Sequence, residues 1–265
     1  MSTNSLRDII LLIGAGILGL ALALGAYVVM HPQTQTSPQE QEIILEQPDG
    51  EVSDAQERAE GEEEETPTAP STSILHEMSF TAQAPFGEWS DPRLQDGCEE
   101  AASLMAVSWA RGETFTLAYA KAEILAVSEY EEATYGSYHD TSAADTLGRI
   151  IEGYFGFNGA HLARNVTKED MIAQLYAGNV LIIPTNGRAL QNPNFTNGGP
   201  DRHMLVVKGY DVATDEFITN DNGTRQGEGY RYNAELLWEA IRDYSSGNHE
   251  PIVGASKVMI VVEPE

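Results

Sequence analysis

Residues 90–110 read SDPRLQDGCEEAASLMAVSWA, and this stretch decides the fold of the C-terminal part of the chain. Its first eight residues contain several turn-forming side chains. Apolar residues then follow at helical spacing, at Ala102, Met105, Ala106 and Trp109. The pattern predicts a helix over residues 98–110 whose first residue, Cys98, is the only cysteine of the chain.

The sequence around this helix divides into a helical half and a strand half. Further helices are predicted over residues 115–130, 143–155 and 168–176, and Thr167 is a suitable N-cap for the last of them. Apolar runs predict strands at residues 179–184, 203–210, 216–220 and 257–262, with a helix over 235–244 before the last strand. Helices followed by strands indicate an α+β domain. Its predicted extent is 74–265, which is long enough for one domain with its own core.

The N-terminal part of the chain has a different composition. After a short tail, residues 1–8, the segment 9–30 reads IILLIGAGILGLALALGAYVVM and contains no charge. A helix of roughly 20 apolar residues spans the hydrocarbon core of a bilayer, so we predict a transmembrane anchor. A cleaved signal peptide stays open as the alternative. Residues 31–73 are acidic, lack aromatic side chains and are expected to form a disordered linker.

Charge and cysteine content limit the partners. Arg7 precedes the apolar segment and no Lys or Arg follows it until Arg58. The positive-inside rule then predicts a single-pass membrane protein with a cytoplasmic N-terminus and an extracytoplasmic C-terminal domain. The formal net charge of −26 disfavours nucleic acid as a partner. A single cysteine excludes an intrachain disulfide and a multi-cysteine zinc site. We expect no metal and no cofactor, and the sequence leaves the oligomeric state open.

Two residues are candidates for nucleophilic chemistry. Cys98 is predicted at a helix N-terminus, where backbone N–H groups favour the thiolate. The neighbouring Glu99 and Glu100 disfavour it, and a buried structural cysteine is the alternative. His203 stands where the loop NPNFTNGGPDR meets a predicted strand, so its imidazole can face a cleft. A surface histidine or a hydrogen-bonded buried one is the alternative.

Two further residues complete a candidate catalytic set. Asp221 follows the strand after that of His203, and a short turn joining the two would bring the carboxylate to the imidazole. Asn220 is the local competitor for this orienting role. Gln83 and Gln95 both precede Cys98, and an amide from either can donate to the oxyanion of acyl transfer.

Three ordered blocks carry a family resemblance. SFTAQAPFGEWSDPRLQDGCEEAASLMA, DRHMLVVKGYD and FITNDNGT resemble cysteine peptidase family thirty-nine, which includes bacterial peptidases that cut after double-glycine leader sites. The resemblance implies a papain-like fold in which a helical part carrying the cysteine helix packs on an antiparallel sheet. It also implies a bacterial source, and roles for Cys98 as nucleophile, His203 as base, Asp221 as orienting group and Gln83 as oxyanion donor.

The chain also departs from the family pattern. Glu99 and Glu100 follow the cysteine where Gly and Pro are frequent, and Asn222 follows the aspartate where Pro is frequent. The leading interpretation is a thiol hydrolase acting on a peptide or protein substrate. A peptide-binding module without catalysis and a cell-wall peptide amidase are the alternatives. We also expect the loop 185–202 to border the cleft.

Overall fold

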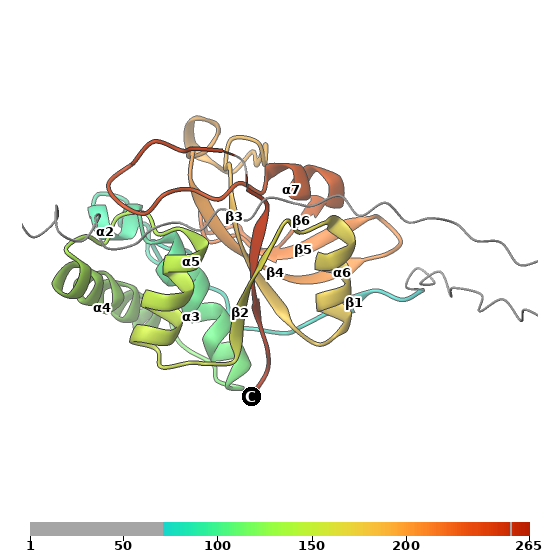
Figure 1. The fold of residues 1–265 in the computed structure, drawn as a ribbon, viewed down its shortest axis with the longest axis horizontal. Helices are drawn as coiled ribbons and strands as arrows, with labels where there is room; N and C mark the ends of the chain where they lie inside the picture. Colours follow the sequence, from blue (N-terminus) through green and yellow to red (C-terminus); the bar gives the residue numbers. More distant parts are fainter. Residues whose placement is uncertain (1–70, 255) are drawn as a thin grey trace, which may run out of the picture. The chain divides into compact units, whose positions relative to one another are not determined.

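The structure, a computed structural model, describes residues 71–254 and 256–265. These residues form an antiparallel sheet with helices on both of its faces (Figure 1). The predicted tail, the predicted anchor and all but the end of the predicted linker lie outside the described residues. Within the described ranges, no helix combines the length and the apolar character that crossing a membrane requires.

The sheet has seven strands, and every pair of neighbours is antiparallel. The strands are β1 (Ile74–Leu75), β2 (Ala160–Arg164), β3 (Val180–Thr185), β4 (His203–Asp211), β5 (Glu216–Asn220), β6 (Glu228–Asn233) and β7 (Val258–Val262). Their order is β2-β7-β3-β4-β5-β6, and the short β1 pairs with β4. The central strands β3 and β7 are buried along their whole length, as expected of strands covered on both faces.

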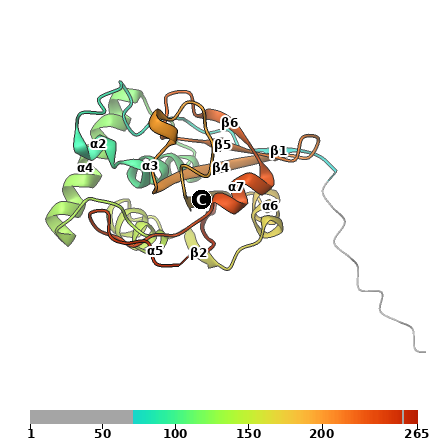
Figure 2. The ribbon, with the colours of Figure 1, turned by 90° about the horizontal axis from the view of Figure 1, so that it is seen from above.

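Helices cover the two faces of this sheet. They are α2 (Pro92–Gln95), α3 (Cys98–Ala110), α4 (Leu117–Tyr135), α5 (Ala143–Asp145), the π-helix η1 (Thr146–Tyr154), α6 (Lys168–Tyr176), the 3-10 helix η2 (Thr196–Gly198) and α7 (Ala234–Ala240). Figure 2 shows α3, α4 and α5 on one side and α6 and α7 on the other. Successive side chains of β3 alternate between the two cores: Ile182 packs with α3 and η1, and Leu181 packs with α6 and α7.

Helix α3 lies at the centre of its side of the sheet. Each of its residues except Trp109 is buried, which is typical of a helix enclosed within a core. Gly97, the residue before α3, allows the backbone to pass close to α2 and α4. A Cβ there would lie 2.9 Å from the backbone oxygen of Arg93 and 3.0 Å from Cγ2 of Ile124. The residue before α3 therefore packs closely against α2 and α4.

The expected α+β layout is confirmed, and α3 and α6 have the predicted bounds. Thr167 caps α6 in a capping box with Asp170. Other boundaries differ. The helix predicted over 115–130 continues to Tyr135, and the one predicted over 143–155 is α5 followed by η1. The helix predicted over 235–244 ends at Ala240, because the extended backbone of Ile241 pairs with Thr185.

Helix α4 brings a carboxyl group into the contact with α3. Glu131 is buried, and neither of its carboxylate oxygens has a hydrogen-bond partner. Burial, reinforced by the charge of Glu99, raises the pKa of Glu131 to about 8. Burial and the charge of Glu131 raise the pKa of Glu100, on α3, well above its ordinary value. The folded domain therefore holds protons that an unfolded chain would release.

This cluster predicts the sign of the pH dependence of stability. Between the ordinary glutamate pKa of 4.5 and a folded pKa of about 8, the native state binds more protons than the unfolded state. The free energy of unfolding should therefore fall as pH rises through this window, by about 1.4 kcal/mol per unit of pKa shift. Urea unfolding of the full chain at several pH values measures this dependence of the free energy of unfolding on pH. The variant Glu131→Gln should flatten the slope, whereas the exposed Glu132→Gln should keep it. Equal slopes for Glu131→Gln and the parent protein would contradict the assignment.

Candidate active site

The predicted nucleophile lies where the sequence places it. Cys98 is the first residue of α3, and only 6% of it is exposed. Its backbone N–H belongs to the first turn of the helix, whose amides have no acceptor within the helix. Such amides can donate hydrogen bonds to a thiolate at Cys98 or to a negatively charged oxygen beside it.

The predicted His–Asp contact is formed. His203 begins β4 and Asp221 directly follows β5, its antiparallel neighbour, in which Asn220 lies opposite Val206. The Nε2–H of His203 donates to Oδ1 of Asp221 at 2.8 Å, and both side chains are buried. This assignment of the proton leaves Nδ1 of His203 as the acceptor of the ring. Asn220 does not compete, because its side-chain amide donates to the backbone oxygen of Ser79.

Several groups hold Asp221 in its charged form. Its Oδ2 accepts from the Tyr232 hydroxyl and from Nδ2 of Asn192 at 3.1 Å, and its Oδ1 also accepts from the backbone N–H of Gly223. Burial acts to raise the pKa of Asp221. The charge and hydrogen bond of His203, with the other donors, outweigh burial, so the pKa lies below its ordinary value. Tyr232 and Asn192 are 11 and 29 positions from Asp221, and the sequence analysis missed both.

The turn after β5 also contacts the other two parts of the candidate site. Asn222 donates from Nδ2 to the backbone oxygen of Cys98 at 2.8 Å. Its own backbone oxygen accepts from the N–H of Gln83 at 2.9 Å. Asp221 and Asn222 therefore connect the histidine, the cysteine and the glutamine. Asn222, a departure from the family pattern, is one more functional residue that the sequence did not single out.

Gln83 is the better placed of the two candidate amides. It is buried, whereas Gln95 is exposed. The Nε2 of Gln83 donates to the backbone oxygen of Gln95 at 2.6 Å and to that of Leu94 at 3.3 Å, so both of its N–H groups have acceptors. These contacts fix the amide plane beside α2.

The four candidate residues converge on one region of the molecule. Gln83, Cys98 and His203 line a cavity of about 360 Å³, and Asp221 lies behind His203. The remaining lining residues come from the end of α2 and from loops, and are Gln95, Asp96, Asp140, Pro200, Asp201, Arg202 and His249. The loop 185–202 therefore borders the cavity, as expected. Asp140 accepts from Nδ1 of His249 at 3.0 Å and pairs with Arg202 at 3.4 Å. The sequence provided no signal for these contacts, which join residues 109 and 62 positions apart.

The thiol itself has an unexpected partner. Sγ of Cys98 donates to Oε2 of Glu99 at 3.0 Å, and no hydrogen bond joins Sγ to His203 among the residues described. Burial, with the charge and hydrogen bond of Glu99, raises the pKa of the Cys98 thiol well above its ordinary value. The backbone N–H of Met204 acts in the opposite direction. In this conformation the thiol is neutral.

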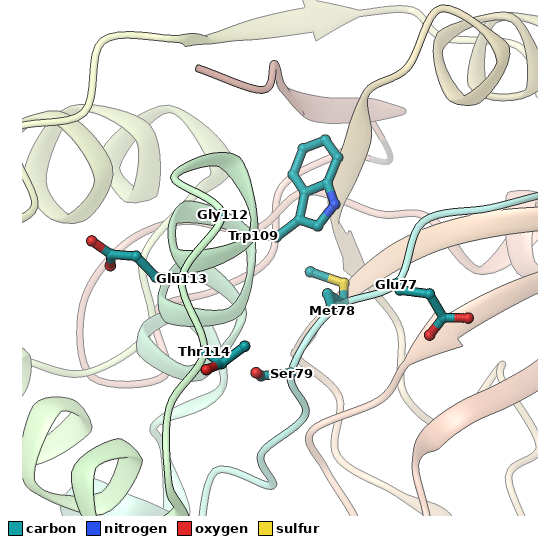
Figure 3. Close-up of a pocket in the computed structure, with 7 residues that line it drawn as sticks. All are labelled: Glu77, Met78, Ser79, Trp109, Gly112, Glu113 and Thr114. Carbon is teal, nitrogen blue, oxygen red and sulfur yellow. The ribbon is translucent and has the colours of Figure 1, made fainter.

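A second cavity, of about 380 Å³, lies at the other end of α3 (Figure 3). It is lined by Glu77, Met78, Ser79, Trp109, Gly112, Glu113 and Thr114. Trp109 is eleven residues along the helix from Cys98, which corresponds to roughly 16 Å. This cavity contains none of the candidate catalytic residues. Over residues 71–254 and 256–265 there is no group of three or more His, Cys, Asp or Glu side chains arranged to hold a metal ion.

The comparisons with known proteins identify the family of the chain. The sequence profile of the Peptidase_C39 like family matches residues 76–246, a span that includes all four candidate residues. The chain belongs to this family, and membership indicates a cysteine peptidase-like function. A crystal structure from Bacillus anthracis, described as that of a C39-like peptidase, shares 16% identity with a TM-score of 0.48. The similarity covers 74% of this chain and 99% of that one. No curated protein matches the chain.

The packing around His203 predicts the effect of one methyl group. A Cβ on Gly223 would lie 2.8 Å from Cε1 of Phe195 and 2.9 Å from Cε1 of His203. Gly223→Ala should therefore displace the imidazole and lower the free energy of unfolding by about 1–3 kcal/mol, measured by urea denaturation. Gly148→Ala is the matched control, because a Cβ there meets open space. Equal stability of the two variants would show that the packing around His203 is loose.

Proposed function

We propose that this protein is a cysteine peptidase that cleaves peptide or amide bonds through an acyl-enzyme at Cys98. One observation carries the proposal: Gln83, Cys98 and His203 line one cavity, and His203 is hydrogen-bonded to the buried Asp221. Membership of the Peptidase_C39 like family supports it. A nucleophile, a base and a group that orients the base are the parts that such catalysis requires.

Each residue has a role in the proposed reaction. Sγ of Cys98 attacks the substrate carbonyl while its proton passes to Nδ1 of His203. The oxyanion accepts hydrogen bonds from the backbone N–H of Cys98 and from Nε2 of Gln83, which exchanges its longer hydrogen bond to the backbone oxygen of Leu94 for one to the oxyanion. The carbon–nitrogen bond then breaks and the His203 imidazolium protonates the leaving amine. A water that gives its proton to His203 attacks the thioester and releases the acid and the free thiol. Asp221 stabilises the imidazolium in both half-reactions.

A second candidate function is a peptide-binding module without catalysis. The observation that favours it is the neutral thiol, which donates to Glu99 rather than to His203. A fold does not by itself imply an activity. In that case, the cavity would bind a peptide and Cys98 would not react.

Turnover by variants of the full chain separates the two candidates. The parent protein should cleave denatured casein or purified murein, and Cys98→Ala should abolish cleavage. His203→Ala should lower the rate by roughly 10²–10⁴-fold, as expected on removal of a general base. His161→Ala, at an exposed histidine of β2, is the control and should keep the rate. Undiminished turnover by Cys98→Ala would overturn the mechanism, and tight peptide binding without turnover by the parent would favour the binding module.

The same assay distinguishes two substrate classes. Cleavage of murein but not of casein would identify a cell-wall peptide amidase, and the reverse would identify a protein peptidase. The loop that contributes Pro200, Asp201 and Arg202 to the cavity is the proposed selector of substrate. Its place in the cavity wall beside Cys98 supports this role.

We further propose that residues 9–30 anchor the protein in a bacterial membrane with the catalytic domain outside the cytoplasm. The uncharged length of this segment and Arg7 before it support the placement. An alkaline phosphatase fusion after Glu265 should be active, since that enzyme folds only where disulfides form. A β-galactosidase fusion at the same position should be inactive. Activity of β-galactosidase alone would reverse the topology and leave the catalytic proposal intact.

A further inference from the structure

The partner of the thiol is a carboxyl group held by hydrogen bonds on both oxygens. Oε2 of Glu99 accepts from Sγ of Cys98 at 3.0 Å. Oε1 accepts from the Tyr244 hydroxyl at 2.7 Å and from the backbone N–H of Thr141 at 3.2 Å. Glu99 is 2% exposed. The carboxyl group is therefore fixed from two loops, and its free edge is directed at the reacting sulfur.

No positive charge compensates Glu99 within this set of contacts. Its three hydrogen-bond donors are a thiol, a phenol and an amide. The charged group that faces it from the loop before α5 is Asp140, whose own partners are Arg202 and His249. Glu100 and Glu131 lie beyond it between α3 and α4, and the raised pKa of each keeps its carboxyl group protonated near neutral pH. Burial first, and Asp140 second, raise the pKa of Glu99 to about 7.

The protonation state of Glu99 determines whether the neutral thiol or the thiolate of Cys98 is stabilised. An ionised carboxylate 3.0 Å from Sγ accepts a hydrogen bond from the thiol. Its negative charge also disfavours a second negative charge on the sulfur. A protonated carboxyl group at the same place is a donor, and an O–H donor stabilises a thiolate. The two protonation states of one buried group therefore have opposite effects on the nucleophile.

We propose that Glu99 is a catalytic residue of this site: in its ionised form it holds Cys98 as the neutral thiol, and in its protonated form it donates a hydrogen bond to the thiolate. In the active form, solvent has supplied one proton to Glu99. The S–H bond of Cys98 then breaks, the N–H bond at Nδ1 of His203 forms, and the thiolate accepts from the O–H of Glu99. The expected effect of Glu99 on turnover rests on the proposed function. Its expected effect on the reactivity of the Cys98 thiol does not.

This arrangement has a defined pH dependence. As pH rises through about 7, Glu99 ionises and the thiol becomes locked in its neutral form. Turnover should therefore fall on the alkaline side, where the rate of a cysteine without such a neighbour would rise with its thiolate fraction.

The contact between Glu99 and Cys98 can be tested without any substrate. The full chain is alkylated with iodoacetamide at several pH values between 5 and 9, and the rate is measured by intact-mass spectrometry. Glu99→Gln keeps an acceptor for Tyr244 and Thr141 and turns an amide donor toward Sγ. At pH 8 it should be alkylated at least about tenfold faster than the parent, corresponding to one unit of thiol pKa. Glu100→Gln is the matched control: Glu100 is buried in the same helix but bonds to Ser128, so this variant should follow the parent. Rates for Glu99→Gln within twofold of the parent at every pH would overturn the inference.

Tyr244→Phe provides a second test should Glu99→Gln fail to fold. It removes the hydroxyl donor from Oε1 and leaves Sγ untouched. Glu99 should then keep its proton to higher pH, so the alkaline suppression of alkylation should begin at higher pH. An unchanged profile would count against the inference. Because alkylation needs no turnover, a protein that cleaves nothing yet shows these shifts would refute the proposed function and leave the control of the Cys98 thiol by Glu99 standing.

Discussion

The candidate site depends on one two-residue connection, Asp221–Asn222, at the end of β5. Asp221 fixes His203, and Asn222 is hydrogen-bonded to the backbones of Cys98 and Gln83. These three residues come from a strand, a helix and a loop. The turn is itself closely packed: a Cβ on Gly227 would lie 1.7 Å from the backbone oxygen of Asp221, so only glycine fits there. Backbone geometry after β5 thus determines the position of His203 relative to Cys98.

Two buried carboxyl groups near this connection have pKa values that are shifted in opposite directions. Asp221 meets an imidazole and several neutral donors, and its pKa lies below the ordinary value. Glu99 is equally buried but faces Asp140 rather than a cation, and its pKa rises to about 7. The difference follows from partners and not from burial. Pairs of groups whose environments separate their pKa values are typical of sites that move protons.

Much of this arrangement could be predicted from the sequence, and the reasons are physical. Helical spacing and the turn before it located α3 and its first residue, Cys98. A strand, a short turn and a second strand placed His203 near Asp221, because antiparallel neighbours joined by a short turn must meet. The edge strands β2 and β6 escaped prediction because they are only partly buried and lack an apolar run, gaining order from backbone pairing. Contacts such as Tyr244 with Glu99 and Tyr232 with Asp221 depend on tertiary packing, which spacing along the chain does not encode.

The central claim is that Cys98, His203 and Gln83 act on one carbonyl group. A crystal structure of the full chain soaked with a peptide aldehyde tests it most directly, because an aldehyde forms a hemithioacetal that mimics the tetrahedral intermediate. We expect a covalent bond from Sγ of Cys98 to the aldehyde carbon, with the oxygen within hydrogen-bond distance of Nε2 of Gln83. A peptide that occupies the cavity with Cys98 unmodified, and its thiol still bonded to Glu99, would contradict it.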